Sequence, residues 1–570
     1  MKCRIRKKFA PSDLLILMTP LLLLFFERPA SAAKVWTSAA SGLWSDTNNW
    51  SGHALPDTTS AVYITNDLTK TVAIDASAVS ANLTIAALFV GAPTGATNTL
   101  ALANGDTNNP LFVLSTMDIS PGAAVRVTNS AFIATNLINN FIDINGMVTL
   151  DGGLIFFDTS ATTKVASVTS GTGTMIINSG SVSVGKLKVG SDLAGVTGYL
   201  TMRGGTLSVS GLLSIAHDLQ TTGIVAVLGG QMRVLNDDLR IGDSGFGSMT
   251  VSNATLWLTN VNIGRDLMSI GTLALQTGAN IIVSNDFSIA RFPGSTGTVV
   301  VNGGLLFIPG QKLYAGRNGK GELDVSNGVV QADSLLVAAD PTNNTASGIF
   351  NMTGGGLNLS TSLLTGGYLL STGQVTVAGG ALNVTNSLAT GYISVPNGTF
   401  TFNGGNITAD NLVLTNAQGK FVFNGGTLHA KGTTVANGTA FVIGNGVTPA
   451  TFYLNGGIYS FANGLTISPN ATLAGCGTVI GTVINNGTIA TNCGISLVKP
   501  QITAQAKNGN TDTISFTTVT GQTYTLEFMN SLANSSWSSI APSTNGTGGV
   551  MSLPDINATG STRFYHIRTQ

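Results

Sequence analysis

The sequence predicts an all-β protein: a right-handed parallel β-helix, or β-solenoid, of about 25 residues per coil, followed by a small C-terminal β-sandwich. Three observations predict this fold class: a motif that returns at a nearly constant interval, apolar residues that alternate with a period of two, and many glycines. Glycine accounts for 71 of the 570 residues, whereas Asp, Glu, Lys and Arg together make up only 9%. We expect no nucleic-acid partner, because binding phosphates requires a stripe of basic residues.

Residues 1–32 have the pattern of an export signal. A head rich in Lys and Arg precedes an apolar run over residues 14–26, and Ala30, Ser31 and Ala32 form a small-residue cleavage site. The alternative is a membrane anchor. No later apolar stretch is long enough to span a bilayer. We therefore expect a mature chain that has no transmembrane segment and is secreted or held at the cell surface.

Residues 33–97 are predicted to form an N-terminal cap and the first irregular coils. They contain three of the five tryptophans, Trp36, Trp44 and Trp50. A solenoid has an open apolar end that must be covered, so we expect these aromatic rings to cap the first coil. The alternative is a platform on which a sugar stacks.

Residues 98–495 carry the repeats, of which "GYLTMRGGTLSVSGLLSIAHD", residues 198–218, is one. Most repeats begin with a glycine, and the intervals between their starts are mostly 24 to 27 residues, with outliers of 21 and 31. Such a period is typical of units that bury their apolar faces only against their neighbours.

Each repeat contains three short apolar alternations, which predict three strands. In the repeat quoted above the pairs are Leu200 and Met202, Leu207 and Val209, and Leu213 and Ile215. Three strands joined by glycine-containing corners close one triangular turn. About 16 such turns, stacked about 4.8 Å apart, would make a rod roughly 75 Å long. A period of two excludes helices, and a propeller blade would need a longer unit.

Two segments resemble autotransporter-type β-solenoid passenger proteins of bacteria. "IGDSGFGSMTVSNATLWLTNVNIG" is similar to their repeats, and "NATLAGCGTVIGTVINNGTIA" is similar to their last coils. The resemblance covers roughly residues 98–495 and implies the fold, but this scaffold carries adhesins, enzymes and inert stalks alike. We expect no membrane β-barrel to follow, because only about 75 residues remain after Cys493.

Residues 500–570 depart from the repeat and are predicted to form the β-sandwich. Ile514 and Phe516, and then Tyr524 and Leu526, continue an alternating pattern suited to antiparallel strands. Capping, attachment to a cell wall and recognition by an export machine are all open as its role.

Cys476 and Cys493 are the cysteines that remain once the export signal, which contains Cys3, is removed. In an oxidising compartment we expect them to form a disulfide. Closing a loop of this length stabilises a fold by about 3 kcal/mol where the bond is unstrained. The alternative is two separate thiols.

Charged residues gather at the corner that follows the third strand of successive repeats. Asp238, Asp243 and Asp266 could supply oxygen ligands to Ca²⁺, and Arg265 or Arg291 could contact an acidic sugar. The alternative is a ladder of opposite charges that keeps this edge soluble, each pair contributing under about 1 kcal/mol. The mixed signs favour the ladder, because a metal site needs carboxylates that converge without cations between them.

Together these features predict a secreted or cell-surface structural or adhesive protein, with a cell-surface or extracellular polysaccharide as its partner. The alternatives are a carbohydrate-active enzyme, similar to a polysaccharide lyase, and a glycan-binding protein that uses the charged edge. We assign no catalytic residue, since none of the four histidines shares a local motif with a plausible nucleophile.

Overall fold

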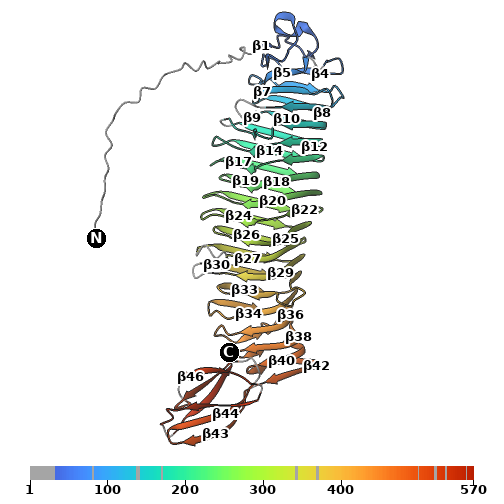
Figure 1. The fold of residues 1–570 in the computed structure, drawn as a ribbon. Coiled ribbons are helices and arrows are strands. Elements are labelled where there is room, and N and C mark those ends of the chain that lie inside the picture. The colour runs from blue at the N-terminus through green and yellow to red at the C-terminus, as the bar shows by residue number, and fades with distance from the viewer. Residues whose placement is uncertain are drawn as a thin grey trace, which may run out of the picture.

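Stacked turns of β-strand form an elongated rod, and a smaller β-module lies at its C-terminal end (Figure 1). The computed structural model describes residues 32–79, 82–135, 141–168, 171–339, 345–367, 371–498, 500–518, 523–532, 536–547, 549–559 and 562–569. The predicted export signal, apart from its last residue, lies outside the described residues.

The rod is a parallel β-solenoid, as the sequence predicts. Over the described residues, 42 strands join in one parallel-paired sheet that makes about 17 turns of about 25 residues each. The N-terminal turns contain β1 (Ala32–Val35), β2 (Gly42–Leu43), β3 (Ser60–Ile64), β4 (Lys70–Ile74), β5 (Thr84–Val90), β6 (Asn98–Leu102), β7 (Leu111–Ile119), β8 (Ala123–Ala134), β9 (Phe141–Ile144), β10 (Met147–Phe157), β11 (Thr162–Val165), β12 (Thr172–Val184) and β13 (Lys186–Val189).

The middle and C-terminal turns continue the same sheet. The middle turns contain β14 (Thr197–Met202), β15 (Thr206–Val209), β16 (Leu213–Ile215), β17 (Thr222–Val227), β18 (Gly230–Ile241), β19 (Phe246–Val251), β20 (Ala254–Ile263), β21 (Ile270–Leu275), β22 (Asn280–Val283), β23 (Phe287–Ile289), β24 (Thr296–Val301), β25 (Leu305–Ala315), β26 (Lys320–Val325), β27 (Val329–Val337), β28 (Ser347–Met352) and β29 (Gly356–Thr365). The C-terminal turns contain β30 (Thr372–Val377), β31 (Ala381–Val384), β32 (Tyr392–Ser394), β33 (Gly398–Phe402), β34 (Asn406–Leu414), β35 (Gly419–Phe423), β36 (Gly426–Val435), β37 (Phe441–Ile443), β38 (Ala450–Phe461), β39 (Leu465–Ile467), β40 (Ala471–Ile480), β41 (Val483–Asn485) and β42 (Thr488–Val498).

The inward apolar residues stack on their counterparts from turn to turn. Leu200 of β14 pairs in register with Val225 of β17, which in turn pairs with Met249 of β19. All three side chains are buried. These side chains belong to one continuous apolar core that runs along the rod from Trp36 to Val479. Burial of this core drives the stacking, because a single turn has no other apolar surface to cover it.

A column of glycines explains why most repeats begin with this residue. Gly198, Gly223, Gly247 and Gly271 occupy the same register position at the start of successive first strands. A Cβ atom added to Gly271 would lie 2.1 Å from the carbonyl oxygen of Ile241 and 2.3 Å from the amide nitrogen of Gly264, which lies in the corner that precedes this strand. The backbone of the corner thus packs directly on the strand and leaves no room for a side chain.

The three N-terminal tryptophans are buried at the first turns. Trp36, Trp44 and Trp50 are at most 1% exposed, and Trp50 packs edge-to-face against the other two with ring centroids 5.0 and 4.9 Å apart. Two short 3₁₀ helices, η1 (Thr47–Asn49) and η2 (Ser51–His53), flank Trp50. No ring face is left for a sugar, and the rings instead extend the core to the end of the rod.

The C-terminal module consists of two antiparallel sheets of three strands each, β43 (Ile502–Asn508), β44 (Thr511–Thr517) and β47 (Val550–Asp555) in one, and β45 (Thr523–Met529), β46 (Ser538–Asn545) and β48 (Phe564–Thr569) in the other. Ile514, Phe516, Tyr524, Leu526 and Ile567 form a separate core between them. The two sheets are the antiparallel pair expected of a small sandwich.

Cys476 lies on β40 and is disulfide-bonded. The side chain of Cys493 lies outside the described residues, so its pairing with Cys476 stays a prediction. Within the described part of the chain, no helix has the length and apolar character needed to cross a membrane.

Replacing a glycine of the column should destabilise the rod. We expect Gly271→Ala to lower the free energy of unfolding by about 1–3 kcal/mol, because its methyl group overlaps backbone atoms that cannot move independently. The matched control is Gly356→Ala, since a Cβ there meets nothing closer than 3.8 Å. Urea unfolding followed by circular dichroism checks both variants, and equal midpoints would contradict this explanation of the column.

Candidate functional site

The structure brings the five charged residues that the sequence singled out into one network. Asp238 lies on β18, Asp243 follows β18, and Arg265 and Asp266 follow β20. Arg265 contacts both Asp243 and Asp266, through Nη1 to oxygen distances of 3.4 and 2.8 Å. Arg291, in the corner after β23, donates to Asn262 Oδ1 at 2.8 Å, and Asn262 Nδ2 in turn donates to Asp238 Oδ2 at 3.4 Å. We call this network the charged edge.

Asp243 is the centre of the charged edge and is almost fully buried, with only 2% of its side chain exposed. Arg240, a residue that the sequence analysis did not select, lies between two of the predicted carboxylates: its Nε is 3.1 Å from Asp238 Oδ2, and its Nη1 is 3.4 Å from Asp243 Oδ2. With Arg265 on the other oxygen, Asp243 is neutralised by cations from its own turn and from the next.

The pKa of Asp243 reflects this surrounding. Burial by itself would raise the pKa, but hydrogen bonds from His217 and Ser214 and the adjacent Arg240 guanidinium hold it below the ordinary value of 3.8. The carboxylate therefore stays ionised in the folded protein and acts as an anchor for its neighbours.

Ser214, His217 and Asp243 lie together, yet their geometry is not that of a hydrolytic triad. Ser214 Oγ and Asp243 Oδ2 both contact His217 Nδ1, at 3.0 and 2.9 Å. In a triad the two partners occupy opposite ring nitrogens, so that the imidazole can carry a proton from the hydroxyl while the carboxylate orients it. Ser214 is also fully buried and donates directly to Asp243 at 2.9 Å. This arrangement stabilises the corner and does not activate a nucleophile.

The outer part of the charged edge continues the alternation of charge. Asp286 contacts Arg291 at 3.5 Å and Arg317 of the following turn at 2.9 Å. Contacts of this kind, between opposite charges within a turn and between adjacent turns, are what the ladder alternative predicts.

The calcium alternative finds no support in these contacts. Asp238, Asp243 and Asp266 each contact an arginine. In the described parts of the chain, no group of three or more His, Cys, Asp or Glu side chains could hold a metal ion. Calcium binding stays a prediction.

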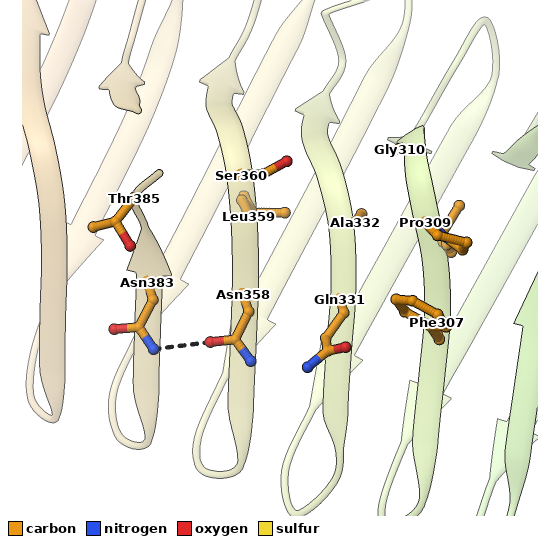
Figure 2. Close-up of a pocket in the computed structure, with 11 residues that line it drawn as sticks. Phe307, Pro309, Gly310, Gln331, Ala332, Asn358, Leu359, Ser360, Asn383 and Thr385 are labelled. Carbon is orange, nitrogen blue, oxygen red and sulfur yellow. Dashed lines mark hydrogen bonds between the residues drawn. The ribbon is translucent and has the colours of Figure 1, made fainter. Parts of the chain in front are cut away.

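A second feature, which the sequence analysis missed, is a hollow in the wall of the rod on the face formed by the second strands. It has a volume of about 480 Å³ and crosses β25, β27, β29 and β31 (Figure 2). Its lining comprises Phe307, Ile308, Pro309, Gly310, Gln331, Ala332, Asn358, Leu359, Ser360, Asn383 and Thr385. None of these residues carries a charge.

The hollow exists because neighbouring turns differ in the length of one corner. The residues on either side of this corner pair across the three strands. Between them, β25 has three residues (309–311), β27 has only Asp333, and β29 has two residues (360–361). The wall is therefore recessed at β27 between two bulged strands. Asp333 holds one side in place, since Ser360 and Thr361 donate to its Oδ1 at 3.0 and 2.6 Å.

The polar residues of the hollow form a row across the strands. Gln331, Asn358 and Asn383 occupy one register position on β27, β29 and β31, and Phe307 holds that position on β25. Figure 2 shows the three amides side by side, with Asn383 Nδ2 donating to Asn358 Oδ1 at 2.9 Å. A turn-by-turn alignment of outward positions could have revealed the row, but the recess depends on corner lengths that periodicity does not report.

Comparison of the chain with protein-family models, with curated proteins and with solved structures finds no match.

Removing the charge of Asp243 should destabilise the rod in a pH-dependent way. We expect Asp243→Asn to lower the free energy of unfolding by roughly 3 kcal/mol at pH 7, because two arginines lose a buried partner. The pKa of Asp243 is lower in the folded chain than its ordinary value of 3.8, so its contribution is complete above that value and is lost as the pH falls through the folded pKa.

Denaturant titrations of both proteins at several pH values measure this difference, which should shrink below about pH 3.8. The control is Asp266→Asn, whose side chain is 37% exposed and should contribute under about 1 kcal/mol. A difference that stays constant or grows toward acid pH would show that the charge of Asp243 is not what stabilises this corner.

Proposed function

We propose that this protein is a secreted or cell-surface rod with a structural and adhesive role, similar in kind to the passengers of autotransporters. The observation that carries the proposal is the uncharged, partly aromatic hollow in the rod wall, because sites for small molecules and sugars are concave surfaces with a few convergent polar groups. The proposed ligand is an extracellular or cell-surface polysaccharide.

Three further features support the proposal. The basic and apolar pattern of residues 1–32 favours export. An elongated rod holds a binding face away from its point of attachment. Arg265 and Arg291, which a lyase would need for an acidic sugar, are engaged by oxygens of the rod itself at 2.8 Å, and this favours a structural role for the charged edge over catalysis.

The adhesive role can be tested with the purified mature chain on an array of extracellular polysaccharides and with cells from which the protein has been deleted. We expect at least one polysaccharide to be retained by the native chain and not by heat-unfolded chain, and attachment of the deletion cells to fall. An empty array together with unchanged attachment would count against the proposal.

The same preparation tests the enzyme alternative. We expect the retained polysaccharide to keep its chain length on size-exclusion chromatography after long incubation with the protein. If the native chain shortens the polysaccharide and Asp243→Asn or Asp266→Asn abolishes this cleavage, the enzymatic alternative replaces the adhesive proposal.

A further inference from the structure

We propose that the hollow binds a neutral, linear polysaccharide that lies parallel to the rod axis, with its sugar rings over successive strands. The inference rests on the proposed function and adds the ligand's charge, shape and direction. Its basis is the row formed by Phe307, Gln331, Asn358 and Asn383 (Figure 2).

The chemistry of the row favours a neutral ligand rich in hydroxyl groups. A carboxamide offers both N–H donors and a carbonyl acceptor, which suits a hydroxyl that also donates and accepts. Thr385 adds a hydroxyl, and Ser360, whose hydroxyl already donates to Asp333, adds an acceptor. Phe307 adds an aromatic ring on which the C–H face of a sugar can pack. An acidic polysaccharide would need a cationic partner, and no described lining residue is cationic.

Two of the three amides, those of Asn358 and Asn383, are held in position before a ligand arrives. The hydrogen bond from Asn383 Nδ2 to Asn358 Oδ1 orients both side chains. It does not use Asn358 Nδ2 or Asn383 Oδ1. The amide group of Asn358, with two N–H donors, and the carbonyl oxygen of Asn383, with two acceptor lone pairs, therefore remain for a ligand. Because these two amides are ordered in advance, binding costs less free energy in fixing them.

The spacing of the row favours a chain that runs along the rod. Adjacent strands are about 4.8 Å apart, which is comparable to the length of one sugar unit in an extended chain. A polymer parallel to the rod axis can therefore place one unit over each strand. A peptide strand would lack backbone partners here, because the strands crossed by the hollow are paired on both sides within the sheet.

The same register position continues beyond the hollow and carries aromatic residues at both ends. Toward the N-terminus it is occupied by Ile282 and Trp257, with the Arg233 guanidinium 4.7 Å from the Trp257 ring centroid. Toward the C-terminus it passes through Thr408 to His429 and Tyr453, whose ring centroids are 5.1 Å apart. A longer chain would meet further stacking surfaces, so affinity should rise with ligand length.

The test is isothermal titration calorimetry of the mature chain with β-1,4-linked gluco- and manno-oligosaccharides of increasing length, and with oligogalacturonates of the same lengths. We expect at least one neutral series to bind, with affinity that rises with length and changes little between low and high salt. We expect no binding of the acidic series. Failure of both neutral series to bind, or tighter binding of the acidic series, would overturn the inference.

Variants of the row locate the site. We expect the double variant Asn358→Ala/Asn383→Ala to bind the neutral oligosaccharide at least about tenfold more weakly, and Phe307→Ala to weaken it similarly. The matched control is Asn403→Ala/Asn424→Ala, which removes another pair of stacked amides, joined at 2.8 Å, from a corner outside the hollow. Circular dichroism melting confirms that each variant is folded.

The outcomes separate this inference from the proposed function. If the polysaccharide array is positive but the Asn358/Asn383 double variant binds as the native chain does, the ligand lies elsewhere and the adhesive role stands. If the array and the attachment assay are both negative, the adhesive role fails, and the hollow is judged by the calorimetry alone.

Discussion

The register of one turn on the next is the constraint on which the whole rod depends. Each turn can bury its apolar residues only against its neighbours, so every inward position must carry a residue that fits the one stacked on it. The same constraint acts on the backbone, where the corner packs on the first strand so closely that Gly271 and its counterparts cannot be replaced without overlap. The sequence repeats because every turn has to meet the same packing requirements.

Stacking in register also determines how the rod carries charge. Like residues at one position place like charges about 4.8 Å apart, and the charged edge does carry Arg265, Arg291 and Arg317 at the same corner of three successive turns. Their repulsion is offset by carboxylates beside them, since each of these arginines contacts at least one aspartate. Asp243, with arginines of two turns on its carboxylate, shows the result. The edge is a set of mutually neutralised groups, whereas the hollow is lined by uncharged polar and apolar residues. This contrast favours the hollow over the edge as the proposed binding surface.

Irregularity, by comparison, is where the rod gains a surface of its own. A solenoid with identical corners would have a flat wall. One short corner at Asp333, between longer corners on β25 and β29, is enough to produce a recess, and it leaves the register on either side unchanged. Small differences in corner length are therefore a means by which a repetitive scaffold acquires a concave surface without disturbing its core.

The sequence by itself determined the strands, their inward residues such as Leu200 and Met202, the glycine positions and the parallel stacking, because alternation and period are local properties that each repeat states again. It also selected Asp238, Asp243, Asp266, Arg265 and Arg291 as one edge. Only the tertiary structure decided which of them touch, that Arg240 and Ser214 share Asp243, and that Phe307 and three amides line a hollow. These contacts join residues from different turns, and their geometry depends on corner lengths and side-chain directions that no single repeat contains.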